Sequence, residues 1–323
     1  MSNKILITGG TGYLGGRIAA DLIAVNKFPV RLTVLPNEGN YPSDLSDCEI
    51  VPMDLLDDQQ INVACRGVGC IIHLAAMNEI ESAMDPERAL AVNGLGTLKL
   101  IQIAEAEGVE RFIYMSTAHV YGAPLVGNIT EATLPRPIHP YAITHRVAED
   151  FVLAALSQCR IQGIVIRLSN AVGSPVHPSV NRWSLVVNDL CRQVVNNGKM
   201  QLRSSGMQMR DFIPIVDVCA AIKHFLILPE VELDDGLFNL GGENSLRIID
   251  LVEIIADRSL DIFGFRPSII KPSAVPGEGT ESPLFYSIDK LKKTGYKLNG
   301  NIINAIDETL LFCEKHFGMK KDE

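Results

Sequence analysis

Three glycines between an apolar run and an amphipathic stretch constrain this chain more than any other feature. Residues 4–8 are largely apolar, Gly9, Gly12 and Gly15 follow, and apolar residues then recur at intervals of three and four. This pattern predicts a strand, a tight turn and a helix. Without Cβ atoms, the turn would let a pyrophosphate approach the backbone N–H groups that open the helix. A tight turn without a ligand is the alternative interpretation.

Apolar runs alternate with amphipathic stretches through the first half of the chain. Strand-like runs cover 30–35, 70–74, 111–115 and 163–168, and amphipathic segments such as 95–107 lie between several of them. Alternation of this kind indicates parallel strands joined by right-handed helical crossovers. We therefore predict an α/β protein with a doubly wound parallel sheet of the Rossmann type.

The alternation stops near Asn170, and the 323-residue length is consistent with roughly two domains. Residues 171–182 contain one glycine and two prolines, which is typical of a long loop. Residues 210–226 and 237–242 again look like a helix and a strand that rejoin the sheet. We therefore expect a dinucleotide-binding domain over 1–170, rejoined by about 210–245, and a smaller, discontinuous substrate lobe over 171–209 and 246–323.

The composition excludes several classes of partner. With 38 acidic and 29 basic residues, the net charge of −9 has the wrong sign for binding nucleic acid or an anionic membrane surface. No apolar run approaches the ~18 residues of a membrane span, and the first residues lack the apolar core of a secretory signal. The seven cysteines are scattered without zinc-binding spacing, so we expect reduced thiols, no metal site and a cytoplasmic protein.

A second cluster of polar residues has the composition of a redox site. Ser116 and Thr117 end one apolar run, and Tyr141 and His145 lie four residues apart, on one face of a predicted helix. A tyrosine hydroxyl can exchange a proton with a sugar hydroxyl or ketone during nicotinamide chemistry, and a threonine can hold the same oxygen. Alternatively, Tyr141 and His145 only cap and pack. His73 ends an apolar run and is predicted to be a core histidine without a chemical role.

With these motifs, the chain resembles the extended short-chain dehydrogenase/reductase family of NAD-dependent sugar-nucleotide epimerases and dehydratases over nearly all of its length. The matching segments are Ile-Thr-Gly-Gly-Thr-Gly-Tyr-Leu-Gly at 7–15, Met-Asp-Leu-Leu-Asp at 53–57, Ile-Ile-His-Leu-Ala-Ala at 71–76, Asn93 with Gly96-Thr97, 111–122, 167–173 and Arg-Asp-Phe-Ile at 210–213. Their order along the chain makes chance agreement negligible.

The resemblance implies NAD as cofactor, a nucleotide sugar as substrate, and a homodimer formed through helices at 95–107 and 141–156. It implies catalytic roles for Thr117, Tyr141 and His145. The residues implied to contact the cofactor are Gly9, Gly12, Tyr13, Leu14, Gly15, Asp54, Leu55, Leu74, Ala75, Ala76, Asn93, Tyr141 and His145, and those implied to contact the substrate are Thr117, Asn170 and Arg210.

Several of these roles have a structural alternative. Asp54, implied near the adenine, is otherwise a loop carboxylate, and Asn93, implied behind the nicotinamide, is otherwise a buried structural amide. Arg210, implied on a substrate diphosphate, is otherwise the partner of an acidic neighbour. The sequence alone leaves these alternatives open.

His145 departs from the family pattern Tyr-x-x-x-Lys. The lysine's fixed charge lowers the tyrosine pKa, and its ammonium binds the nicotinamide ribose. A unit charge at ~6 Å and an effective dielectric of ~20 is worth about 3 kcal/mol, or roughly two pKa units. Histidine is largely neutral at pH 7, so it can bind a ribose hydroxyl but should activate Tyr141 less. Two hypotheses follow: a slow or half-reaction oxidoreductase, or a family member that binds cofactor without turnover.

The second predicted strand ends in Pro36, where relatives that prefer NAD carry an aspartate for the adenosine ribose. Proline offers no side-chain acceptor. No arginine takes the place of the aspartate to hold a 2′-phosphate either, although Arg17, just beyond the glycines, could reach one. We favour NAD because members of the resembled family commonly use it, and keep NADP as the alternative.

Thr117 is followed by Ala118 and His119, where dehydratases of the family carry an Asp-Glu pair. We therefore predict oxidation or reduction at a ring carbon, C4 in most relatives, as an epimerase or a dehydrogenase/ketoreductase, and not a 4,6-dehydratase. His119 is either an additional acid/base or a histidine outside the reacting centre. A non-catalytic nucleotide-binding protein and a ketoreductase of a non-nucleotide ketone remain the alternative functions.

Overall fold

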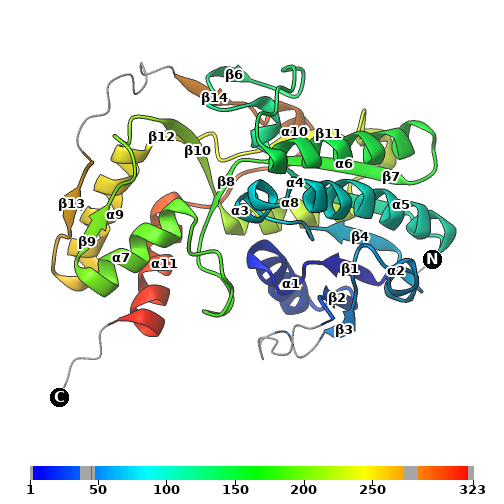
Figure 1. Ribbon diagram of the computed structural model, residues 1–323, viewed down its shortest axis with the longest axis horizontal. Coiled ribbons are helices and arrows are strands. Elements are labelled where there is room, and N and C mark those ends of the chain that lie inside the picture. Colours follow the sequence, from blue (N-terminus) through cyan, green and yellow to red (C-terminus); the bar gives the residue numbers. More distant parts are fainter. Residues whose placement is uncertain (1–2, 37–44, 46–47, 273–282, 319–323) are drawn as a thin grey trace.

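The centre of the protein is a seven-stranded parallel sheet, seen in a computed structural model that describes residues 3–36, 45, 48–272 and 283–318 (Figure 1). Across the sheet the strands are β3 (Glu49–Pro52), β2 (Val30–Val34), β1 (Ile5–Thr8), β4 (Cys70–His73), β5 (Arg111–Thr117), β7 (Gln162–Leu168) and β11 (Leu237–Leu240). The chain moves outward from β1 in both directions, so the strand order reverses between β1 and β4. This confirms the doubly wound sheet and directs attention to the carboxyl ends of these two strands.

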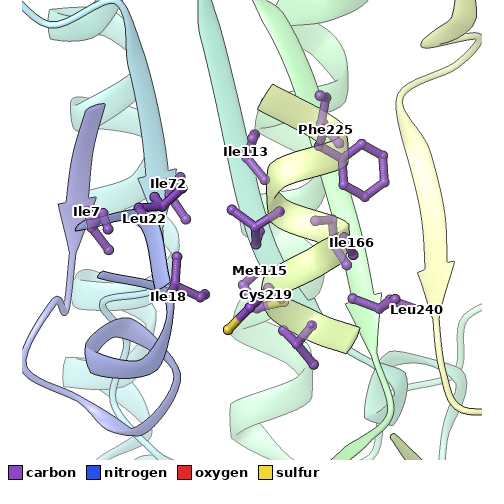
Figure 2. Packing of buried hydrophobic residues seen from close by; sticks show 14 of the residues in the cluster. Ile7, Ile18, Leu22, Ile72, Ile113, Met115, Ile166, Cys219, Phe225 and Leu240 are labelled. Carbon is purple, nitrogen blue, oxygen red and sulfur yellow. The ribbon is translucent and has the colours of Figure 1, made fainter. Parts of the chain in front are cut away.

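Helices cover both faces of the sheet. On one face lie α1 (Tyr13–Val25) and α8 (Ile215–Ile227), and on the other lie α2 (Asp58–Cys65), α5 (Gly96–Ala106) and α6 (Pro140–Ser157). Figure 2 shows the first of these two cores, where Ile18 of α1 and Phe225 of α8 lie against strand residues such as Ile72 and Ile113. Because successive residues of the central strands alternate between two buried faces, these strands are mostly apolar, whereas the edge strand β3 is partly exposed.

A second group of elements has its own hydrophobic core and lies beside the sheet, on the left in Figure 1. Its helices pack through buried residues such as Leu190, Ile255 and Ile306. It is built from α7 (Val186–Asn197), α9 (Ile248–Phe263) and α11 (Ile302–Phe317), with β8 (Asn170–Val172), β10 (Met209–Pro214), β12 (Ser245–Arg247), β9 (Lys199–Gln201) and β13 (Ser268–Ile270). These elements form the side of the molecule that faces the carboxyl ends of the strands.

The prediction of a helix over 210–226 is wrong in its first turn. Residues 209–214 form β10, which pairs parallel with β8 and antiparallel with β12. Pro214 has φ −58° and ψ 137°, so α8 begins only at Ile215. The carboxylate of Asp211 accepts hydrogen bonds from the backbone N–H groups of Gly242 and Asn244 and from Ser169. These long-range bonds hold the segment extended, and local periodicity does not reveal them.

A stretch of the range 246–323, assigned from the sequence to the substrate lobe, packs on the sheet domain instead. There β14 (Leu284–Tyr286) pairs with β6 (Gly127–Ile129), and α10 (Asp289–Lys293) follows. Ile288, Leu291 and Tyr296 belong to the hydrophobic core beneath α1 and α8. The remaining short elements are α3 (Glu79–Met84), α4 (Pro86–Ala89), the π-helix η2 (Leu90–Leu95), and the 3-10 helices η3 (Ala118–Tyr121) and η4 (Glu230–Glu232). Among the described helices, none is long and apolar enough to cross a bilayer.

Candidate functional site

A cavity of about 1010 Å³ lies at the carboxyl ends of β1, β4 and β5. Its sheet side is formed by the β1–α1 turn, the loop after β4, the end of β5 and the first turns of α6. Residues 179–190 and 201–212 form its other side. This volume is at the upper end of the range for ligand pockets, and the position is the strand-order reversal where doubly wound sheets bind ligands.

The β1–α1 turn depends on glycine at two positions. Gly9 adopts φ +66°, and a Cβ on Gly15 would lie 2.1 Å from the carbonyl oxygen of Gly9. Gly12 begins α1 with no side-chain cap from any described residue, which leaves the first-turn N–H groups for a ligand. A close backbone approach and the positive end of a 13-residue helix together make a site for a phosphate group.

A chain of hydrogen bonds beneath this turn connects β1, β4 and α5. The Thr97 hydroxyl donates to the Asn93 carbonyl at 2.6 Å, so at 2.9 Å it accepts from Nε2 of His73. Nδ1 of His73 then accepts from the Thr8 hydroxyl at 2.7 Å. Burial lowers the pKa of His73 to about 3, so the ring is neutral. The structure confirms a core histidine, whose bonds fix the loop after β4.

Tyr141 and His145 lie on successive turns of α6 and face the cavity. The helix begins after His139, whose Nδ1 accepts from the Tyr141 N–H at 3.2 Å. The Tyr141 and His145 ring centroids are 4.3 Å apart, and both rings line the cavity together with Thr117 at the end of β5. Burial, reinforced by the Glu79 carboxylate, raises the pKa of Tyr141 well above its usual value. The phenol is therefore protonated and can donate a hydrogen bond to a ligand oxygen.

His145 is nearly enclosed, with 3% of its surface exposed. Its Nδ1 lies 2.5 Å from the hydroxyl of Tyr114, whereas its Nε2 is buried without a hydrogen-bond partner among the described residues. Burial lowers the pKa of His145 to about 4, so the ring is neutral at pH 7. A buried nitrogen that lacks a partner and borders a cavity is suited to bind a ligand hydroxyl.

The two buried neutral histidines predict acid sensitivity. Because the pKa values of His73 and His145 lie near 3 and 4 in the folded protein and near 6.5 when unfolded, the unfolded chain binds more protons between those limits. Stability should therefore fall as the pH drops from about 6.5 to 4, by about 1.4 kcal/mol per pH unit for each histidine. Urea unfolding at several pH values measures this slope. His145→Gln should make it shallower, and an unchanged slope would contradict the assignment.

The next turn of α6 is anchored by a buried ion pair. Glu149 accepts from Arg167 of β7 at 2.7 and 3.0 Å, and from the Ser116 hydroxyl at 2.5 Å. Both charged side chains are at most 1% exposed, and the Arg167 guanidinium lies 4.6 Å from the ring centroid of Tyr121. Glu149 lies four residues after His145, so the same helix face carries the cavity residues and their anchor.

Most of the residues predicted from the sequence line this one cavity. They are Gly9, Gly12, Tyr13, Leu14, Gly15, Leu74, Ala75, Ala76, Thr117, Tyr141, His145, Asn170 and Arg210. His119, left open in the sequence analysis, also lines it, and burial lowers the pKa of its ring. The remaining predicted residues, Asp54, Leu55 and Asn93, lie outside the cavity lining.

Asp54, Leu55 and Asn93 make contacts with other parts of the protein. Asp54 accepts from the backbone N–H of Leu56 at 2.9 Å within its loop. Leu55 is 5% exposed and belongs to the core under α2 and α5. Asn93 accepts from the Met77 N–H at 2.8 Å and donates to the Thr144 hydroxyl at 3.0 Å. Asn93 thus connects the loop after β4 to the α6 turn that carries the tyrosine.

Two of the predicted substrate residues also have partners in the chain. Nδ2 of Asn170 donates to the Asp211 carbonyl at 2.9 Å, and the Arg210 guanidinium donates to the Gln208 side chain at 3.2 Å. Among the described residues, the side-chain partner of Arg210 is thus an amide and not an acidic neighbour. Arg17, considered for a 2′-phosphate, lies 3.9 Å from Glu308.

The structure adds three residues that the sequence analysis did not identify as functional. Tyr114 contacts His145 from β5, and Glu79 and Arg182 form an ion pair at the cavity, with N–O distances of 3.2 and 3.5 Å. Glu79 and Arg182 are 103 positions apart, so no sequence pattern connects them. For Tyr114 the sequence contains only a weak indication. It is a tyrosine in an otherwise apolar strand, and a buried tyrosine hydroxyl needs a hydrogen-bond partner.

Comparison with known proteins identifies the family. The profile of the NAD dependent epimerase/dehydratase family matches residues 5–241, more than two thirds of the chain. The chain belongs to this family. A mouse dTDP-D-glucose 4,6-dehydratase is 25% identical over 264 residues, covering 78% of this chain and 72% of that protein. A putative UDP-glucose 4-epimerase of Methanocaldococcus jannaschii is 25% identical over 298 residues, covering 91% and 92%.

A solved structure shares the fold. RMD of Pseudomonas aeruginosa, in complex with NADPH, superposes with a TM-score of 0.76 at 24% identity, covering 97% of this chain and all of the other. Epimerases, dehydratases and a cofactor complex thus all appear among proteins similar to this epimerase/dehydratase family member. Because dehydratases are included, the family alone does not decide which reaction this member catalyses.

Proposed function

We propose that this protein is an NAD-dependent oxidoreductase that oxidises or reduces a ring carbon of a nucleotide sugar, C4, as an epimerase or a dehydrogenase/ketoreductase. The proposal rests on one observation. Tyr141, His145 and Thr117 line the same cavity as the glycine turn. Relatives named as sugar-nucleotide epimerases and dehydratases support the substrate class.

The residues around the cavity fit a dinucleotide. The Gly9–Gly15 turn, in which a Cβ on Gly15 would clash with the Gly9 carbonyl, would hold the pyrophosphate. The Nε2 of His145, which has no partner among the described residues, would bind a ribose hydroxyl. When bound, the nicotinamide supplies or takes up the redox equivalent. The family's description favours NAD. The absence of a carboxylate at Pro36 and an NADPH-bound neighbour keep NADP as the alternative.

Side chains of the protein would then transfer the proton and position the substrate. After losing its proton, the Tyr141 oxygen would as phenolate take the proton of the reacting alcohol during oxidation, and the phenol so formed would donate that proton to the carbonyl oxygen during reduction. The Thr117 hydroxyl would hold the same oxygen, and Arg210, at the lobe side of the cavity, would neutralise the diphosphate. Asn170 would contact the sugar. The Thr117-Ala118-His119 sequence lacks the acid–base pair for dehydration, which supports redox chemistry without loss of water.

We also propose a cytoplasmic homodimer that pairs through α5 and α6. Leu95, immediately before α5, and Ile143 of α6 are 46% and 44% exposed, and large apolar side chains on neighbouring helices favour an interface. The described cysteines are free thiols, in keeping with a reducing compartment. Sedimentation of the purified protein, with Leu95→Glu as the disrupting variant, tests the dimer.

The proposed function is tested by incubating the protein with NAD or NADH and a set of UDP-, dTDP- and GDP-hexoses. We expect a change in nicotinamide absorbance, or interconversion of epimers by NMR, with at least one of them. We also expect a nucleoside diphosphate to raise the melting temperature. Cofactor binding without any turnover would instead favour a non-catalytic nucleotide-binding protein, and turnover of a simple ketone without nucleotide protection would favour a ketoreductase.

Exchange of the imidazole for an amine tests whether position 145 limits the reaction. His145→Lys places a permanent cation beside Tyr141, which should lower the phenol pKa and move the alkaline rise of the rate towards neutral pH. We expect about 10-fold faster turnover at pH 7, corresponding to one unit of pKa. Measured pH–rate profiles for both proteins check this. Identical profiles would mean that position 145 does not tune the tyrosine.

A further inference from the structure

The hydroxyl of Tyr114 has one hydrogen-bond partner in the described part of the chain, and that partner is His145. Tyr114 lies in the middle of β5 and is 2% exposed, and its oxygen is 2.5 Å from Nδ1 of His145. Burial raises the pKa of this phenol well above its ordinary value, so the oxygen keeps its proton at neutral pH. A buried hydroxyl that keeps its proton needs an acceptor, and Nδ1 is the acceptor within reach. Tyr114 therefore donates to His145.

This hydrogen bond determines which nitrogen of His145 carries the ring proton. The ring is neutral at pH 7, because burial lowers its pKa to about 4, and a neutral imidazole has one N–H and one bare nitrogen. Since Nδ1 accepts from Tyr114, the proton is on Nε2. Nε2 is buried and has no partner among the residues that the structure describes, and the ring lines the cavity. The imidazole therefore presents an N–H donor to a ligand and not a lone pair.

The orientation of the His145 ring is fixed from two sides. The ring of Tyr141 meets it edge to face, with centroids 4.3 Å apart and an angle of 67° between the planes. The ring of Tyr114 lies on β5, with centroids 5.7 Å apart and an angle of 31°. A rotation that moved Nδ1 away from β5 would leave the Tyr114 hydroxyl without its acceptor. The position of the ring and the position of its proton therefore depend on the same contact.

We propose that Tyr114 is a positioning residue, which holds the proton of His145 on Nε2 so that the imidazole donates a hydrogen bond to a ribose hydroxyl oxygen of the cofactor. This inference rests on the proposed function, in which a dinucleotide occupies the cavity. Tyr114 acts through His145, since it is not among the residues that line the cavity. The ribose hydroxyl accepts this bond and keeps its own proton for another acceptor.

The position of the proton is read from the ring nitrogens of the full chain, without cofactor. In a neutral imidazole the protonated and the bare nitrogen have well-separated ¹⁵N chemical shifts, and long-range ¹H–¹⁵N spectra distinguish Nδ1 from Nε2. At pH 7 we expect His145, identified by the signals that His145→Gln removes, to be protonated at Nε2. In Tyr114→Phe we expect its two nitrogen shifts to move towards each other, because the group that selects one tautomer is gone.

Tyr121→Phe is the matched control, because it removes another buried tyrosine hydroxyl, one that bonds elsewhere. It should leave the His145 signals unchanged. His73 is a second control within each spectrum, since its Nε2–H donates to Thr97 and Tyr114→Phe should not alter its tautomer. Thermal melting confirms that each variant is folded. A His145 ring protonated at Nδ1, or a tautomer that Tyr114→Phe leaves unchanged, would overturn the proposal.

Calorimetry with NAD tests what the Nε2 proton contributes to binding. Tyr114→Phe should weaken NAD binding by about 3- to 10-fold, the usual net contribution of one neutral hydrogen bond. In a His145→Lys background the ammonium donates whatever occupies position 114, so Tyr114→Phe should change the affinity less than about two-fold. An equal loss in both backgrounds would mean that Tyr114 contributes only packing, and would overturn the proposal. A parent protein that binds no NAD would contradict the proposed function, whereas the tautomer is measured without any ligand.

Discussion

Replacement of Tyr141 by phenylalanine should reduce turnover of the sugar nucleotide by about 10²–10⁴-fold, the usual contribution of a positioned acid–base group. The substitution removes only the hydroxyl and retains the ring that packs 4.3 Å from His145. We therefore expect kcat to fall while NAD binding, measured by calorimetry, changes less than a few fold. The glycine turn, which would hold the pyrophosphate, is untouched.

Tyr121→Phe provides the matched comparison for this variant. It also removes a buried tyrosine hydroxyl, but that hydroxyl donates to Asn239 at 2.7 Å, away from the residues that line the cavity. Its loss should lower stability by about 1 kcal/mol and leave kcat nearly unchanged. A Tyr141→Phe protein that turns over within a few fold of the parent would contradict the proposed proton transfer, whatever the fold.

Most of the sheet was predictable because short stretches of sequence indicate where its strands lie. Six of its seven strands coincide with short runs read from the sequence, and the glycine turn after β1 appears within nine residues of sequence. The edge strand β3, Glu-Ile-Val-Pro, was not predicted because it is neither long nor strongly apolar. The errors arose where distant residues determine the structure. Residues 209–214 are extended because β8 and β12 pair with them, and β14 joins the sheet domain because β6 offers an edge. Neither pairing leaves a periodic signal in the segment itself.

The same distinction applies to the site. Tyr141 and His145 are one helical turn apart, so sequence spacing places them together. The residues that surround them are paired over long distances: Glu79 with Arg182, and Glu149 with Arg167. An arginine in an apolar strand such as β7 requires a buried partner, since an unpaired buried charge is unstable. The sequence did not identify that partner.

Glu149→Leu should lower the free energy of unfolding by about 3–5 kcal/mol, because it leaves Arg167 buried without its counter-ion. The carboxylate accepts from Nε and Nη2 of Arg167 and from Ser116, and the Glu149 side chain is fully buried. Urea unfolding of the two proteins at pH 7 measures the difference. The adjacent Ser116 would also lose its acceptor, so the end of β5 that carries Thr117 should become less ordered.

The double variant Glu149→Leu with Arg167→Met separates the charge from the packing. Both charges are removed, and apolar side chains of similar size can fill the space, so much of the stability lost in the single variant should return. If the double variant is at least as unstable as Glu149→Leu alone, the pair acts mainly through shape and not through charge compensation. If the double variant regains stability but not turnover, the Glu149 carboxylate is needed to position Ser116 and Thr117 beside Tyr141. The third turn of α6 would then be part of the site.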